Sequence, residues 1–161
     1  MSDQKEPDPL LRAAAWVVST RPVSWLYLHV FPHIDRPLLR LSRGRLSVSL
    51  GMPVVLLETV GARSGQPRTT PLVYALDGED VILIASKGGS PHHPAWYHNL
   101  RKHPTVHCTL RGARRRYRAR EAQGAERTAA WRKALQVYPG YARYQDRAGK
   151  RRIPVFVLEP A

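Results

Sequence analysis

The sequence has a single cysteine, Cys108, among its 161 residues, so no internal disulfide can form. Its N-terminus lacks the basic, apolar and small-residue order of a secretory signal, and we therefore expect a cytoplasmic protein. No apolar run reaches the roughly 18 residues of a membrane-spanning helix, because the longest candidates are interrupted by Arg12, Arg21, Pro22 and Arg36. The length fits one domain with its own core.

Motifs for several kinds of chemistry are also missing. There is no Walker loop, no Gly-x-Gly-x-x-Gly fingerprint, no Gly-x-Ser-x-Gly elbow and no paired carboxylate motif. His93 and His98 lack metal-ligand spacing, so we expect no metal site. An enzyme of this composition would depend on a cofactor for its chemistry.

Acidic residues are scarce. Twelve Asp and Glu stand against 26 Lys and Arg, which gives a formal net charge of +14. Such an excess indicates an anionic partner, which would be a nucleic acid, an anionic membrane surface or a polyanionic small molecule. A GC-rich genome would also enrich arginine, so the charge alone does not choose among them.

Residues 1–45 are predicted to form a polar tail followed by two short amphipathic helices, at 10–18 and 23–31. Aromatic side chains lie among arginines here, a pattern typical of peripheral contact with an anionic membrane. The aromatic residues concerned are Trp16, Trp25, Tyr27 and Phe31. Packing of the same helices on the main core explains the pattern slightly better.

Residues 46–161 read as a mainly β domain with flanking helices, an α+β arrangement of antiparallel strands. Strands are predicted at 53–60, 69–76, 80–86, 105–110, 114–121 and 153–158, and helices at 94–102 and 124–137. Pro71 lies inside a predicted strand and indicates an edge position or a bulge. Four alternating arginines in 114–121 indicate an exposed sheet face, which we prefer to a nucleic-acid surface.

Two turn-rich segments are candidates for binding an anion. Segment 61–72 combines two glycines with Arg63, Arg68 and short hydroxyl side chains, a set that suits a phosphate or carboxylate tail. Segment 86–90 carries a glycine pair ahead of a predicted helix N-terminus, whose free backbone N–H groups favour anions. An ordinary hairpin turn and a simple helix cap are the respective alternatives.

Three tyrosines, Tyr138, Tyr141 and Tyr144, recur at three-residue spacing after the helix 124–137. A helical turn would point the three phenols in the same direction. They would form either a partly buried aromatic stripe or the polar-tipped wall of a ligand pocket.

Three sequence blocks, 57–72, 85–89 and 93–100, resemble the deazaflavin-dependent nitroreductase and quinone reductase family of actinobacteria. The resemblance extends to the strand near the C-terminus. It implies a split β-barrel of the FMN-binding type that holds coenzyme F-420, a hydride carrier with a phosphate and polyglutamate tail. Flavin mononucleotide is the second choice of cofactor.

The resemblance also assigns residues. The family's coenzyme-binding positions fall here on Arg63, Ser64, Gly65, Gln66, Pro67, Arg68, Thr70, Pro71, Ala85, Ser86, Lys87, Gly88, Gly89, Pro94, Trp96, Tyr97 and Asn99. The catalytic candidates are Ser86, as a donor to the ring or to the acceptor oxygen, and the tyrosines Tyr138, Tyr141 and Tyr144 on the substrate side.

One position departs from the family pattern. Family members commonly carry two adjacent basic residues before the Ser/Thr-Gly of the first block, and this chain has Ala62 in the first of those places. The loss of one exposed cation would weaken tail binding by about 1 kcal/mol.

The expected function is hydride transfer from reduced F-420 to a quinone-like or nitroaromatic acceptor. Two alternatives remain open at this point: a split-barrel module that binds the coenzyme or a lipid without turnover, and an FMN-dependent oxidoreductase. Some members of the family associate with the membrane through their N-terminal segment.

Overall fold

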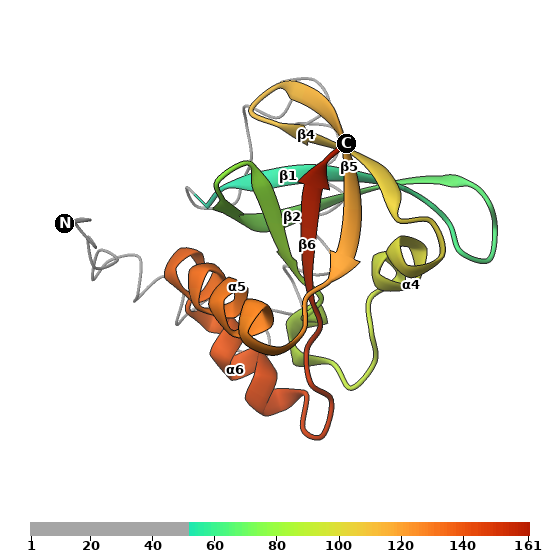
Figure 1. Cartoon of the computed structure of the whole chain (residues 1–161). Coiled ribbons are helices and arrows are strands. Elements are labelled where there is room, and N and C mark those ends of the chain that lie inside the picture. The colour runs from blue at the N-terminus through green and yellow to red at the C-terminus, as the bar shows by residue number, and fades with distance from the viewer. Residues whose placement is uncertain (1–51) are drawn as a thin grey trace.

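The computed structural model describes residues 52–161 (Figure 1). The predicted tail and helices of residues 1–45 lie outside the described residues, so their boundary with the barrel domain stays a prediction. Within the described range, none of the helices has the length and apolar character needed to cross a membrane.

The secondary structure follows the predicted order closely. The strands are β1 (Val54–Val60), β2 (Pro67–Asp77), β3 (Asp80–Ile84), β4 (Thr105–Leu110), β5 (Ala113–Glu121) and β6 (Val155–Pro160). The helices are the short 3₁₀ turn η1 (Lys87–Gly89), α4 (Ala95–Lys102), α5 (Gly124–Val137) and α6 (Gly140–Arg147). For the six strands and for α4 and α5, predicted and observed ends agree within about two residues, as expected where helices and strands fray, whereas no bounds were predicted for η1 and α6.

The strands form a closed antiparallel barrel in the order β1-β2-β3-β6-β5-β4. This confirms the expected mainly β, split-barrel fold. Residue Pro71 pairs with Leu56 of β1, whereas β2 pairs with β3 only over residues 74–77. Among residues 52–161, Pro71 therefore has a ladder partner on one side alone, which fits the edge position predicted for a residue without an N–H.

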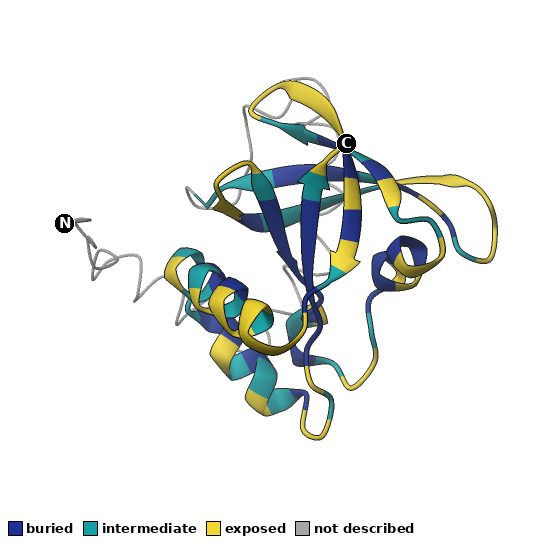
Figure 2. Cartoon of the chain, in the orientation of Figure 1, coloured by how far each residue is buried: buried dark blue, intermediate teal, exposed yellow. Residues whose placement is uncertain are grey.

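Burial of the strands depends on what covers the outside of the barrel. Strands β3 and β6 are apolar on both faces, because one face lines the barrel interior and the other packs under α5 and α6. The outer face of β5 carries alternating arginines that stay exposed (Figure 2). The arginines on this face are Arg114, Arg116, Arg118 and Arg120.

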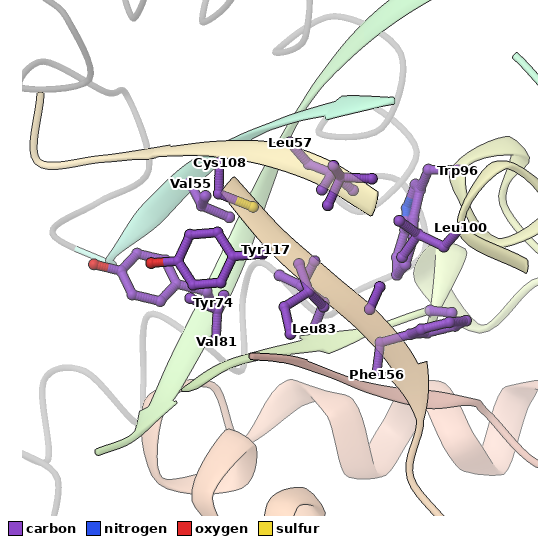
Figure 3. Packing of buried hydrophobic residues seen from close by; sticks show 14 of the residues in the cluster. Val55, Leu57, Tyr74, Val81, Leu83, Trp96, Leu100, Cys108, Tyr117 and Phe156 are labelled. Carbon is purple, nitrogen blue, oxygen red and sulfur yellow. The ribbon is translucent and has the colours of Figure 1, made fainter. Parts of the chain in front are cut away.

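Helix α4 closes one end of the barrel core. Its residues Trp96 and Leu100 are buried with Phe156 of β6, and the indole ring lies 5.9 Å from the Phe156 ring in an edge-on arrangement. Figure 3 shows this group at one end of the core and Tyr74 with Tyr117 at the other. Apolar burial of this kind is the main force that holds a short helix in place.

Candidate functional site

The loop between β1 and β2 is the first of the two predicted anion-binding segments. The hairpin ladder runs to the pair Val60 and Pro67, so Pro67 and Arg68 lie in β2 and the loop proper spans residues 61–66. Two backbone bonds close it: the N–H of Gly61 donates to Gln66 and the N–H of Gly65 donates to Gly61, both at 2.8 Å. The whole stretch from Arg63 to Arg68 is exposed.

Hydroxyl and glycine positions shape this loop. The Ser64 Oγ accepts a hydrogen bond from the N–H of Gln66 at 3.3 Å, which leaves the hydroxyl proton of Ser64 available. Gly65 has φ of +66°, a left-handed conformation that glycine adopts at little cost. Ser64, Gly65 and Gln66 therefore have a structural role in the loop, and their contact with a coenzyme tail stays a prediction.

Helix α4 holds the β1–β2 loop from the side. The buried Asn99 accepts the N–H of Ala62 at 2.8 Å through Oδ1 and donates through Nδ2 to the Thr59 hydroxyl at 3.0 Å. At the end of the helix, the Lys102 ammonium donates to the Ala62 carbonyl at 2.7 Å. Asn99, predicted to touch the coenzyme, thus has both groups of its amide bonded to the protein.

The second segment follows β3 and has an unusual backbone. Three successive residues, Lys87, Gly88 and Gly89, have positive φ of 48°, 63° and 82°. Gly89 is packed so tightly against α6 that a Cβ there would lie 2.6 Å from the Cβ of Arg147 and 2.8 Å from the carbonyl oxygen of Tyr144. Glycine is required at this position for both reasons.

Arg151, in the connection between α6 and β6, holds this segment from the other side. Its guanidinium donates to the carbonyl oxygens of Ser90 at 2.9 Å, Ala85 at 3.1 Å and Ser86 at 2.8 Å. One nitrogen also lies 3.3 Å from Nδ1 of His93. Burial lowers the pKa of Arg151 from its ordinary value, and the planar guanidinium, with five N–H donors, compensates for lost water through these contacts.

His93 lies between Arg151 and helix α4. Its ring stacks on Tyr97, with centroids 4.1 Å apart and planes 15° apart. Because an arginine can only donate, Nδ1 accepts and the proton of the neutral ring is on Nε2. Burial, followed by the charge of Arg151, lowers the pKa of His93 from its ordinary value and favours the neutral ring.

Ser86, the predicted donor, is largely buried at the start of this segment. Its carbonyl accepts bonds from Arg151 and from the N–H of Gly89. Its hydroxyl makes no hydrogen bond with any residue in the range 52–161. The side chain is thus positioned by its own backbone and free to bond a ligand.

The three predicted wall tyrosines, Tyr138, Tyr141 and Tyr144, are all buried and touch one another. The hydroxyls of Tyr138 and Tyr144 are 3.0 Å apart, and Tyr144 lies on α6 where that helix packs against Gly89. The structure therefore brings α6, which carries two of the tyrosines, against residues 86–90, called the Ser86 segment below. The three rings belong to a buried cluster between α5, α6 and the barrel. Their role toward a substrate stays a prediction.

The remaining residues predicted to bind the coenzyme make contacts within the protein, as a helix cap or as packed rings. Pro94, predicted as the first helical residue, is instead the N-cap of α4, which begins at Ala95, and the Trp96 and Tyr97 rings pack on Phe156. The other two, Thr70 and Pro71, are half-buried in β2.

Sequence reasoning missed Arg151, His93 as its partner, and Lys102. No local pattern marks Arg151 among 26 basic residues, because its four acceptors come from segment 85–93, which is distant along the chain. Among residues 52–161, no three His, Cys, Asp or Glu side chains are grouped as a metal ion would require.

Comparison with known proteins identifies the family. A family model described as F420H(2)-dependent quinone reductase matches residues 36–160. The chain belongs to this family. It is 37% identical over 142 residues to an F420H(2)-dependent quinone reductase of Mycobacterium tuberculosis, a match that covers 83% of this chain and 95% of that protein.

Solved structures agree with this. An F420-H2 dependent reductase, FDR-A, is 42% identical, with 66% of this chain and 94% of that chain covered and a TM-score of 0.62. A chain described as a domain-swapped dimer is 35% identical, with coverages of 86% and 99% and a TM-score of 0.64.

Membership in the F420H(2)-dependent quinone reductase family confirms three expectations from the sequence. The protein is an oxidoreductase, its coenzyme is F-420 and its acceptor class is a quinone. The finding removes the need for the FMN and non-catalytic alternatives. The individual binding and catalytic residues stay predictions.

Arg151→Lys should loosen the Ser86 segment, because a lysine ammonium cannot reach all four acceptors at once. With a net cost of roughly 1 kcal/mol for each lost hydrogen bond, we expect about 2 kcal/mol of destabilisation in urea unfolding. Amide hydrogen exchange at Gly89 should accelerate. Arg127→Lys is the matched control, since Arg127 is also partly buried but donates only to Ile153, at 2.9 Å. Unchanged exchange at Gly89 would contradict the role given to Arg151.

Proposed function

We propose that the β1–β2 loop binds the phosphate and glutamate tail of coenzyme F-420 while the Ser86 segment lies beside its ring. The observation that supports the tail assignment is charge. Arg63 on the loop and Arg68 at the start of β2 are exposed, and neither has an acidic partner in the described residues. Exposed cations without carboxylate partners are suited to bind phosphate and carboxylate groups.

The donor chemistry of the site fits the coenzyme. An acidic tail needs cations and N–H groups, which the loop supplies, and a flat polar ring needs apolar surface with a few placed donors. The second segment supplies the buried Ala85, the free hydroxyl of Ser86 and the backbone of two glycines. The two segments contact the same helix, α4, through Asn99 and His93, and a helix of eight residues is about 12 Å long.

The chemistry of the reaction comes from the coenzyme, which in its reduced form carries the hydride that the acceptor takes up. The protein's part is to bind and orient. Arg151 fixes the backbone of Ser86, so the Ser86 hydroxyl is held ready to donate toward the negative charge that develops on the ring or on the acceptor oxygen. Tyr138, Tyr141 and Tyr144 form the aromatic side of the acceptor site in this proposal.

Nitroaromatic compounds are a further proposed acceptor class. They share with quinones a flat apolar ring and polar oxygens that gain charge on reduction, the features that an aromatic wall and a hydroxyl donor would recognise. Support comes from the aromatic cluster of Tyr138, Tyr141 and Tyr144, in which Tyr144 contacts Gly89 through its backbone.

Stopped-flow oxidation of reduced F-420 tests the reaction. We expect menadione, a model quinone, to accelerate the loss of the reduced coenzyme well above the rate in buffer, and a nitroaromatic acceptor to react more slowly. Ser86→Ala should lower the rate constant about tenfold while the coenzyme dissociation constant stays within twofold, because the hydroxyl acts as charge develops. Equal rates with and without protein for every quinone would refute turnover.

Arg68→Ala should weaken binding of F-420 by about 1 kcal/mol, roughly a fivefold rise in the dissociation constant, with little change in thermal stability. Arg116→Ala is the control, since Arg116 is exposed on the outer face of β5. An unchanged dissociation constant of F-420 for Arg68→Ala would show that the tail binds elsewhere.

Residues 1–45 are proposed to touch an anionic membrane surface, which would bring the enzyme to lipid-soluble quinones. The support is the run of aromatic and arginine residues in that segment. Liposome flotation should therefore depend on acidic lipid and on the presence of residues 1–45. Equal flotation of full-length and truncated chains would argue against this contact.

A further inference from the structure

Lys102, the last residue of α4, carries a charge to a loop that is distant along the chain. Its ammonium lies 2.7 Å from the carbonyl oxygen of Ala62 and is exposed. A lysine at a helix end often serves only the carbonyls of its own last turn. Here the acceptor is the carbonyl of Ala62 in the β1–β2 loop instead.

The ammonium is held in a defined place, because both backbone groups of Ala62, its N–H and its carbonyl, are hydrogen-bonded to residues of α4. Asn99 accepts the N–H of Ala62 at 2.8 Å, and Asn99 is itself buried and bonded to Thr59. Lys102 then binds the carbonyl of the same residue. A lysine fixed in this way has already lost much of the side-chain entropy that binding an anion would otherwise cost.

Two of the three N–H donors of the ammonium remain free after the bond to Ala62. Since the side chain is exposed, these donors face solvent next to the backbone of Ala62, the residue before Arg63. Ala62 has no charged side chain, and the Lys102 ammonium brings a positive charge to this position from α4.

Some cations elsewhere on the surface are compensated by carboxylates. Arg114 pairs with Glu58, Arg120 pairs with Glu126 and Glu159, and Lys133 pairs with Asp77. In the described residues, no acidic side chain pairs with Arg63, Arg68 or Lys102. Arg63 on the loop, Arg68 at the start of β2 and Lys102 at the end of α4 are therefore three cations at this site whose charge is not neutralised within residues 52–161.

We propose that Lys102 is a third cationic contact for the acidic tail of the coenzyme, acting on its phosphate or carboxylate oxygens. This inference rests on the proposed function of the β1–β2 loop. The contact is electrostatic and distant from the ring, so it affects tail-bearing coenzyme alone and weakens as salt screens it.

Lys102→Gln tests this by fluorescence titration of two probes, F-420 itself and a ring fragment that lacks the phosphate and glutamates. At low salt we expect a three- to fivefold rise in the dissociation constant of F-420 and no change for the fragment. In 0.5 M NaCl the difference between variant and wild type should shrink below twofold. Lys102→Arg should restore most of the affinity.

Lys133→Gln is the matched control, because it removes the same charge from a half-exposed lysine on α5. Its F-420 constant should equal that of the wild type. If Lys102→Gln binds F-420 as tightly as wild type while Arg68→Ala does not, the inference about Lys102 is wrong and the tail site stands. If Lys102→Gln weakens both probes equally, the residue shapes the loop and the inference is likewise overturned.

A different result would contradict the proposed function of the β1–β2 loop itself. If F-420 and the tail-less fragment bind wild type equally well, and neither Arg68→Ala nor Lys102→Gln changes either constant, the loop does not hold the tail. Both proposals then fall together, and this outcome is distinct from the loss of the Lys102 contact alone.

Discussion

Packing of α4 into one end of the barrel is the contact on which the candidate site depends. Trp96 and Leu100 are inserted among core residues, and this burial fixes the helix relative to the strands. The opposite parts of the same helix then hold both site segments, through Asn99 and Lys102 on the β1–β2 loop and through Tyr97 stacked on His93.

Arg151 also holds part of the candidate site in place, but through hydrogen bonds from a charged group and not through apolar packing. Removing part of its hydration is costly, and the cost is offset because three carbonyls and one imidazole nitrogen surround the guanidinium. No carboxylate takes part among these contacts. The result is a backbone around Ser86 that is fixed while its hydroxyl stays free, which is the kind of preorganisation that a hydride-transfer enzyme needs from its protein.

The surface charge has two different uses in this structure. On β5, Arg114 and Arg120 are paired with carboxylates and belong to an exposed sheet face. Around the β1–β2 loop the cations Arg63, Arg68 and Lys102 lack such partners among the described residues. Arg116 and Arg118 of β5 also lack carboxylate partners among the described residues, so the proposed tail site rests on the combination of uncompensated cations with the glycines and hydroxyl side chains of the loop.

Local sequence determined the strands, helices α4 and α5 and the two glycine-bearing segments, because side-chain alternation, proline and glycine act within a few residues. The four residues of β3 that follow Asp80, all apolar, already indicated burial on both faces, and Pro71 indicated an edge. Only the tertiary structure decided that Arg151 holds the Ser86 segment and that Lys102 reaches Ala62. Those contacts join parts of the chain that are far apart in sequence, and a basic residue looks the same along the chain whether its partner is solvent, a carbonyl or a ligand.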